Sequence, residues 1–383
     1  MVEDLSICTA PNLNCFRSMI QLHTLRRRRA ALSAGIAVVT VLLPQTSIGQ
    51  TQAAAKTATQ PKQQAATAFT EKNVETAPAR FPLRIPATGP ITLQLQILLD
   101  RAGFSPGIID AAWGINAAKA ITFFAKPDDN ARFTGDSPPA VTSIDRATYE
   151  RLRLAAQPKP LLRWYTVTRS DLAGPFTPIP ENVYQQAKLS CLCYSTPAEE
   201  LSERFHTSPQ FLAQLNRRVK FDKLEPGTRI LVPNVEVDGS AIPQDTAIAA
   251  RLIISKKGFW THVVDANGKI IYHFPSTLGA GYDPSPSGDF KVTDVSPEPA
   301  FHYQPKLFAE VPDSEPDARL PAGPNSPVGV VWISLSKPHY GIHGTSTPAT
   351  IGYANSHGCV RLTNWDALRL SDLVDYGTPV QFR

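Results

Sequence analysis

Hydrophobic residues change their spacing along the chain, and the change separates a helical part from strand-rich parts. Apolar side chains recur on one helical face over residues 91–99, with the three- and four-residue spacing of an amphipathic helix. Two more helices are expected, one over 117–125 with Asn116 as its N-cap and one over 145–155. The pattern therefore predicts a small three-helix domain over residues 89–157.

A mixed pattern follows over residues 158–236. We expect a first strand at 164–167 and a returning strand at 224–233, both rich in aliphatic and aromatic residues. Helices are expected between them at 197–205 and 208–215, so the order is strand, helix, helix, strand. About 30 residues are inserted between the first strand and the first helix, which is long for a connection inside a compact domain.

From residue 247 to the C-terminus, runs of β-branched and aromatic residues alternate with loops. Asn267-Gly268 between two of these runs is a strong hairpin signal. The proline-rich residues 296–327 are expected to hold no regular structure, and a short helix is expected from Asn364. The expected strands are 252–255, 259–265, 269–274, 289–295, 329–335 and 379–382. This order predicts a β-rich sandwich domain with few helices over residues 247–383.

The first 88 residues have the composition of a leader and a linker. Arg26 to Arg29 precede an uncharged run over 30–43 and then small residues, which predicts a signal peptide over 1–49 and a location in the periplasm or cell wall. The apolar run is shorter than the about 20 residues of a membrane span, although an uncleaved anchor and a start at Met19 stay open. Residues 50–88 contain almost no large apolar side chains and are expected to be a disordered linker.

Charge and length limit the function further. A chain of 383 residues is long enough for two or three domains, and residues 1–49 carry +3 of its formal net charge of +5. The remainder shows no basic stripe interleaved with aromatic residues, so no nucleic-acid partner is expected.

Cysteine usage points to one reactive thiol. Removal of the leader leaves Cys191, Cys193 and Cys359, and an odd number in an exported protein indicates a free thiol. A bond between Cys191 and Cys193 is expected to be strained because only one residue separates them, so Cys359 is the expected free cysteine. No cysteine–histidine spacing matches a zinc site and no phosphate-binding glycine loop is present, so neither a metal nor an organic cofactor is expected.

Two short segments surround that cysteine with histidines. They are Tyr340-Gly341-Ile342-His343-Gly344 and Ser356-His357-Gly358-Cys359-Val360-Arg361. A thiol with a pKa near about 8.5 is mostly protonated at neutral pH, and a neutral imidazole is the side chain best matched to accept its proton. Gly358 lets backbone N–H groups lie beside the sulfur, where they can face a developing oxyanion. The alternative is a buried structural cysteine flanked by core histidines.

Together the two segments resemble the catalytic signature of the L,D-transpeptidases of the YkuD type. The resemblance extends over most of the last 130 residues or so, and it implies that residues 296–327 act as a lid over the cleft, called the lid segment below. It implies Cys359 as the nucleophile and His343 as the general base, with the backbone carbonyl of Gly344 holding the imidazole.

The same resemblance implies roles for the residues around the nucleophile. His357 and Gly358 are expected to shape the oxyanion loop. Arg361, Tyr340 and Ser356 are expected to bind substrate, Arg361 as the partner of a substrate carboxylate. A structural salt bridge for Arg361 and simple packing for Tyr340 are the alternatives.

Both modules before the catalytic domain resemble wall-binding domains. Residues 89–157 resemble the small three-helix peptidoglycan-binding domain, and residues 158–236 are similar to a LysM domain. These resemblances imply the glycan strands of peptidoglycan as a partner. A helical packing module without ligand affinity is the alternative for residues 89–157.

The implied substrate is the stem peptide of peptidoglycan. Cys359 would attack the carbonyl of its third residue, expel D-alanine and form a thioester, which the amine of a second stem resolves to a 3→3 cross-link. Carbapenem-type β-lactams are the implied covalent inhibitors. Three alternatives stay open: an L,D-carboxypeptidase or other hydrolase on the same site, an enzyme that attaches or detaches wall proteins, and a non-catalytic peptidoglycan-binding protein.

Overall fold

The computed structural model describes the chain in six stretches, 69–78, 80–127, 141–235, 249–281, 283–308 and 311–383. The predicted signal peptide and the predicted linker up to residue 68 lie outside the described residues. Within these six stretches, no helix is both long enough and apolar enough to cross a membrane.

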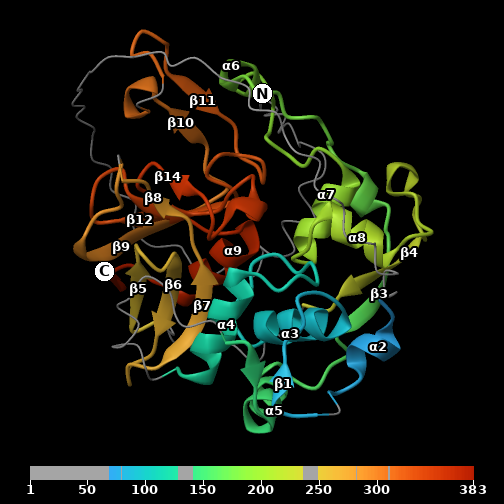
Figure 1. The fold of residues 1–383 in the computed structure, drawn as a ribbon. Coiled ribbons are helices and arrows are strands. Elements are labelled where there is room, and N and C mark those ends of the chain that lie inside the picture. Colours follow the sequence, from blue (N-terminus) through green and yellow to red (C-terminus); the bar gives the residue numbers. More distant parts are fainter. Residues whose placement is uncertain (1–68, 79, 128–140, 236–248, 282, 309–310) are drawn as a thin grey trace, which may run out of the picture.

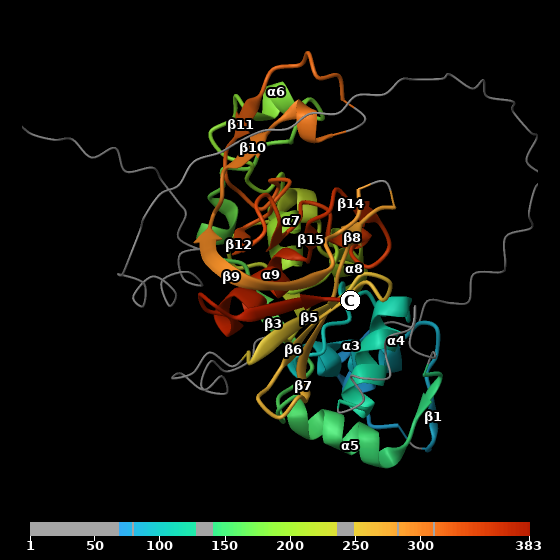
Figure 2. The ribbon, with the colours of Figure 1, turned by 90° about the vertical axis from the view of Figure 1, so that its left-hand side faces the viewer.

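The C-terminal part of the chain is built on one eight-stranded sheet (Figures 1 and 2), in the order β15-β13-β12-β9-β16-β5-β6-β7. Its strands are β5 (Arg251–Ser255), β6 (Trp260–Val264), β7 (Ile270–Pro275), β9 (Gly288–Pro297), β12 (Val331–Leu335), β13 (Gly341–His343), β15 (Val360–Arg361) and β16 (Pro379–Phe382). All six predicted strands are present, shifted by a few residues at their ends. β13 and β15 lie inside the two motif segments, where the residue pattern predicts no strand.

The long strand β9 joins the two halves of this sheet. Its residues 288–291 pair with β16, whereas residues 292–297 pair with β12. The sheet therefore curls around a core that receives apolar side chains from both halves and from helix α9 (Asn364–Leu373). The prediction of a β-rich domain is confirmed. The two halves of the predicted sandwich are continuous with each other, because β9 is long enough to pair in both.

The three predicted helices of the next part are α3 (Pro90–Arg101), α4 (Ile115–Ala125) and α5 (Arg146–Ala155). Asp145 caps α5 by accepting a hydrogen bond from the backbone of Thr148. Helix α4 begins before its predicted cap, because Gly114 takes the cap position. Asn116 lies in the first turn instead, and its side-chain amide donates to the carbonyl of Ile351 at 2.9 Å.

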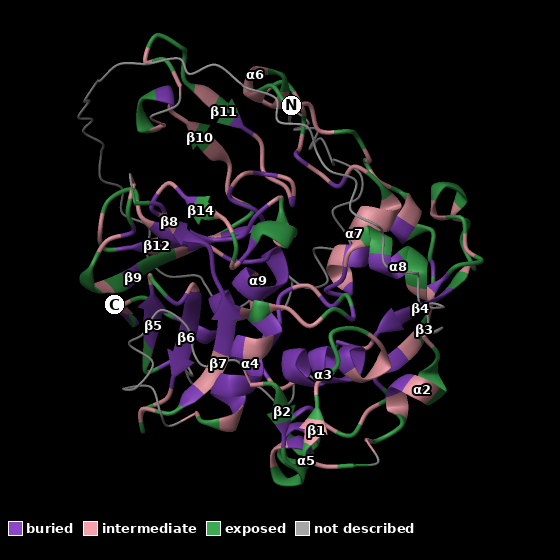
Figure 3. Ribbon diagram, viewed as in Figure 1, coloured by how far each residue is buried: buried purple, intermediate pink, exposed green. Residues whose placement is uncertain are grey.

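These helices and the sheet share one hydrophobic core. Helix α4 lies alongside β7 (Figure 1), and Phe123 of α4 packs edge-on against Trp260 of β6 with ring centroids 5.3 Å apart. Ile253 of β5 belongs to the same buried cluster. Figure 3 shows α3 and strands β5 to β7 as largely buried elements. The helical part is therefore packed as a layer of the catalytic domain.

The predicted disorder of residues 50–88 is wrong for its last part. Residues 69–78 and 80–88 contain helix α2 (Glu71–Glu75) and strand β1 (Leu83–Arg84), which pairs with β2 (Ser143–Ile144). Val74 of α2 is fully buried, and its carbonyl accepts a hydrogen bond from Gln94 of α3 at 2.6 Å. Phe69, Phe81, Leu83 and Ile85 also pack against the shared core, so contacts with the rest of the chain order a segment that has the composition of a linker.

The second module has the predicted order of strand, helix, helix, strand. Its elements are β3 (Leu162–Thr166), α7 (Pro197–Arg204), α8 (Pro209–Leu215) and β4 (Arg229–Pro233), and β3 pairs antiparallel with β4. The insertion over 167–196 contains the 3₁₀ turn η1 (Ser170–Leu172) and helix α6 (Val183–Gln186). The similarity of this module to LysM stays a prediction.

The lid segment holds regular structure, contrary to the prediction. Within its described residues β10 (Phe301–Tyr303) and β11 (Ala318–Leu320) form an antiparallel pair, with the 3₁₀ turn η4 (Pro305–Leu307) between them. The strands form because residues 301–303 and 318–320 contain no proline. Both Figure 1 and Figure 2 show this pair beside α6 of the insertion.

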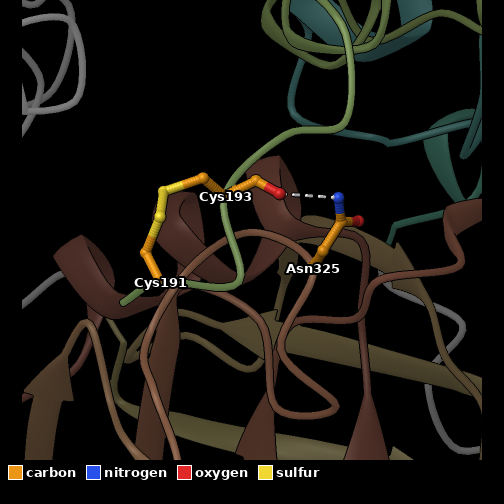
Figure 4. The surroundings of a disulfide bond; sticks show 3 residues. All are labelled: Cys191, Cys193 and Asn325. Carbon is orange, nitrogen blue, oxygen red and sulfur yellow. Dashed lines mark hydrogen bonds between the residues drawn. A yellow bond between two sulfur atoms is a disulfide. The ribbon is translucent and has the colours of Figure 1, made fainter. Parts of the chain in front are cut away.

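A disulfide loop fastens the insertion to the lid segment. Cys191 and Cys193 are bonded, since the backbone between them turns and leaves their Cα atoms 5.2 Å apart, within the usual disulfide range. Cys359 is a free cysteine, as expected. Leu192 between the two bonded cysteines donates to the carbonyl of Ala322 and accepts from the backbone of Asn325, each at 2.9 Å. The Asn325 side chain also donates to the carbonyl of Cys193 at 3.0 Å (Figure 4).

A buried charge cluster ties both N-terminal modules to α9. Asp100 of α3 is fully buried and lies 3.2 Å from the guanidinium of Arg369 on α9 and 2.9 Å from Nδ1 of His206. Burial acts to raise the pKa of Asp100, and the charges of His206 and Arg369 outweigh it, so the pKa falls below its usual range. Because removing one partner would leave a buried charge unpaired, the cluster holds the three parts in one arrangement.

Two neutral histidines lie in the core between α4 and the sheet. His262 of β6 and His273 of β7 are fully buried, with Nε2 of the first 3.0 Å from Nδ1 of the second. Trp260 stacks on His262 at 3.8 Å, and Phe123 packs edge-on against it at 4.3 Å. Burial lowers the pKa of both histidines well below 6.5.

This pair makes acid pH destabilising. The unfolded chain takes up protons on both histidines below about pH 6.5, whereas the folded chain does not, so each one reduces stability as the pH falls through that value. Replacing both with Phe should flatten the dependence of the unfolding free energy on pH in this acid range, by about 1.4 kcal/mol per pH unit for each histidine. Urea unfolding at a series of pH values measures the slope. The exposed His302→Gln variant is the control and should keep the parent slope.

Candidate active site

Two adjacent strands bring the cysteine and the first histidine together. β13 and β15 run parallel, with Ile342 opposite Val360 and His343 opposite Arg361. The backbone N–H of Leu362 donates to the carbonyl of His343 at 2.9 Å, which continues the pairing. Cys359 directly precedes β15, so the fifteen residues between His343 and Cys359 form a loop whose two ends lie on neighbouring strands.

Cys359 is a free thiol of intermediate exposure. Its Sγ lies 3.6 Å from the carbonyl oxygen of His339, a contact in which the thiol donates. Burial raises the pKa of Cys359, and the negative charge of Asp283 raises it further. A hydrogen bond from the Gly341 backbone and the positive charge of Arg361 act in the opposite direction. The net shift is upward, so the resting group is a protonated thiol at neutral pH.

His343 is buried and neutral. Its Nδ1 lies 2.7 Å from the carbonyl oxygen of Gly344, the contact that the family resemblance implies. Because a carbonyl only accepts, Nδ1 carries the proton and Nε2 keeps a free lone pair. Trp332 of β12 stacks on the imidazole with centroids 5.1 Å apart and an angle of 13°. Burial, and then the charge of Arg361, lower the pKa of His343 to about 3, although the Gly344 contact opposes this shift.

The loop before the sulfur is held by two serines. Ser285 donates its hydroxyl hydrogen to the carbonyl of Gly358 at 2.8 Å and accepts from the backbone of Gly279 at 2.8 Å. Ser356 is buried, and its hydroxyl donates to the carbonyl of Cys359 at 2.6 Å. The hydroxyl hydrogen of Ser356 is thus used inside the loop, and a contact of Ser356 with substrate stays a prediction. The sequence gives no signal for Ser285, which lies in a proline-rich turn far from the motif.

The remaining predicted residues lie around this loop. Gly358 has φ +96°, and Tyr340 packs so closely on it that a Cβ there would be crowded at 3.0 Å from the ring, so the position requires glycine. The ring of His357 packs edge-on against Phe308 of the lid segment, with centroids 5.0 Å apart. Arg361 exchanges backbone hydrogen bonds with Thr277, and its charge lowers the pKa of both Cys359 and His343.

Two further residues near the site escape the sequence pattern. Asn364, the first residue of α9, accepts a hydrogen bond from the backbone of Thr345 at 3.0 Å. Glu203 of α7 accepts one from the side chain of Asn364 at 2.9 Å. Across the stretches that the structure describes, no group of three or more His, Cys, Asp or Glu side chains is arranged to hold a metal ion.

Comparison with known proteins agrees with this geometry. Residues 249–382 match the family model of the L,D-transpeptidase catalytic domain. YkuD of Bacillus subtilis (strain 168), whose name assigns it to the L,D-transpeptidases, is 30% identical over 176 residues, which are 46% of this chain and 87% of that protein. The chain belongs to the L,D-transpeptidase family.

A second relative and a solved structure extend the comparison. The L,D-transpeptidase homologue YkuD of Bacillus licheniformis is 28% identical over 182 residues, 48% of this chain and 90% of that protein. The structure titled LD transpeptidase LdtMt1 in complex with imipenem shares 20% identity with a TM-score of 0.28, over 34% of this chain and 57% of that one. The matched catalytic domain begins two residues after its predicted start at residue 247.

Asp283 and Arg361 have opposite charges near the sulfur, so removing them one at a time should shift the pKa of Cys359 in opposite directions. Asp283→Asn should lower the pKa of Cys359, because it removes a negative charge that disfavours the thiolate. Arg361→Gln should raise that pKa, because it removes a positive charge that favours the thiolate. The pH dependence of iodoacetamide alkylation from about pH 6 to pH 10 measures both shifts. Shifts of the same sign in the two variants would contradict the arrangement of charges.

Proposed function

We propose that the chain is a peptidoglycan L,D-transpeptidase that forms 3→3 cross-links between stem peptides through a thioester on Cys359. The observation that supports the proposal is the pairing of β13 with β15, because His343, a neutral imidazole with its proton on Nδ1, then lies on the strand beside the one that Cys359 precedes. The family is that of enzymes named for this reaction.

The first half-reaction is acylation of the enzyme. The sulfur of Cys359 attacks the carbonyl carbon of the third stem residue while its proton passes to Nε2 of His343. The negative charge that develops on the carbonyl oxygen faces the backbone N–H groups around Gly358 and Cys359, whose peptide Ser285 holds in place. The carbon–nitrogen bond to D-alanine then breaks, and the proton on His343 goes to the departing amine.

The second half-reaction transfers the acyl group. The side-chain amine of a second stem attacks the thioester carbonyl and gives its proton to His343. His343 passes this proton to the sulfur as the carbon–sulfur bond breaks, so Cys359 leaves as the thiol and the imidazole is neutral again. A resting pair made of a neutral thiol and a neutral imidazole suits this cycle, since the proton moves only when an acyl carbonyl is in place. Arg361 and Tyr340 are proposed to contact the substrate, and His357 to order the oxyanion loop.

The proposed substrate also sets the location and the roles of the modules. Peptidoglycan lies outside the cytoplasmic membrane, so we propose an exported protein of the periplasm or cell wall. The helical and LysM-like modules are proposed to contact glycan strands, and carbapenems are proposed to acylate Cys359. Wall-attached proteins are a further class of acceptor.

Purified protein incubated with a donor tetrapeptide stem tests the reaction. We expect mass spectrometry to find a cross-linked dimer with loss of D-alanine, whereas a trimmed tripeptide alone would indicate hydrolysis and an unchanged stem would reject catalysis. Cys359→Ala should abolish the product. His343→Ala should reduce the rate on the order of 10²–10⁴-fold. His357→Ala should have a smaller effect, and a larger loss there than in His343→Ala would reverse the assignment of the base.

A further inference from the structure

Helix α7 of the LysM-like module places an acidic side chain behind the catalytic loop. Oε1 of Glu203 accepts two hydrogen bonds, from the side-chain amide of Asn364 and from the hydroxyl of Tyr194, both at 2.9 Å. Glu203 has intermediate exposure as a residue, and its carboxyl group is the buried part. Burial raises the pKa of this carboxyl to about 7.

Asn364 connects Glu203 to the catalytic loop through hydrogen bonds on both sides of its amide. It is 1% exposed, and its Nδ2 donates both to Glu203 and to the carbonyl of Pro324 at 3.1 Å. Its Oδ1 accepts from the backbone N–H of Thr345 at 3.0 Å. A Cβ on Gly344 would collide with the same Oδ1, so the backbone at 344–345 lies directly on this amide.

The contacts that start at Glu203 lead to His343, the proposed general base. Gly344, the residue that lies against Asn364, uses its carbonyl to hold Nδ1 of His343 at 2.7 Å. Oε1 of Glu203 and the carbonyl oxygen of Pro324 both accept from Nδ2 of Asn364, so together they hold the NH₂ end of this amide toward themselves. The oxygen end is then directed at Thr345, which is the orientation that fixes the peptide next to His343.

We propose that Glu203 is a positioning residue for His343, acting through Asn364 and the Gly344 carbonyl. The second module thereby supplies part of the catalytic centre, in addition to any contact that it makes with glycan. The inference rests on the proposed function in one respect only, the role of His343 as the base. The expected tautomer of His343 does not depend on whether the acceptor of the acyl group is a stem peptide.

Acylation by imipenem at a series of pH values tests the proposal on the full chain. In Glu203→Ala the rate at pH 7 should fall roughly 10- to 100-fold, because a misplaced base costs about that much. This deficit should shrink as the pH rises, since hydroxide then forms the thiolate without the imidazole. Glu203→Gln keeps an acceptor oxygen for Asn364 and should retain most of the rate. Glu200→Ala, which removes a neighbouring acid of α7 that pairs with Arg204, should behave as the parent protein.

A second readout does not depend on activity. Nitrogen-15 spectra of the imidazoles, assigned with His343→Ala, should show the Nδ1–H tautomer of His343 in the parent and in Glu203→Gln. In Glu203→Ala this signature should be lost or mixed, while melting temperatures establish that the variant is folded. A parent tautomer in Glu203→Ala, or a rate deficit of equal size at every pH, would overturn the proposal. Failure of the parent protein to form any adduct would instead count against the proposed function, and the spectra would still decide the role of Glu203.

Discussion

The parallel pairing of β13 with β15 is the constraint on which the site depends. Parallel neighbours cannot be joined by a tight turn, so the chain must leave the sheet and return, and here that excursion begins at His343 and ends at Cys359. Cys359 and His343 thus lie at the two ends of one loop. Hydrogen bonds from Ser285 and Ser356 hold one end of this loop, and a hydrogen bond to Asn364 holds the other. The same hydrogen bonds therefore fix the distance between the thiol and the imidazole.

Burial is the second influence on this centre. It favours the uncharged form of both partners, and Arg361 is placed where its charge offsets part of that effect on the thiol while adding to it on the imidazole. An ion pair is therefore not the resting state. The site combines a weak acid with a weak base, and its reactivity depends on geometry at the moment of attack.

The sequence could predict what is local and could not predict what is distant. Cys359, His343 and the Gly344 contact follow from two short segments, and strands β5, β6, β7, β9, β12 and β16 follow from runs of β-branched and aromatic residues. Glu203 and Asn364 are 161 positions apart, and a glutamate on a short amphipathic helix has no pattern that distinguishes it from a solvated one. The order of residues 69–78 and 80–88 escapes the sequence pattern for the same reason, since the carbonyl of Val74 accepts a hydrogen bond from Gln94 of α3. Spacing alone leaves the state of Cys191 and Cys193 open, because the local backbone sets the distance between their Cα atoms.

The close fit of Gly323 against the disulfide loop limits how these two segments can change in evolution. Its φ of +146° and its contact with the disulfide loop leave no space for a side chain, since a Cβ would meet the carbonyl of Leu192. The loop and this turn of the lid segment fit each other only as a matched pair. A lineage that lost the insertion would leave the backbone groups of Ala322 and Asn325 without partners, and one that replaced the glycine would dislodge the loop. Exchange of either segment between relatives by recombination therefore requires that both travel together.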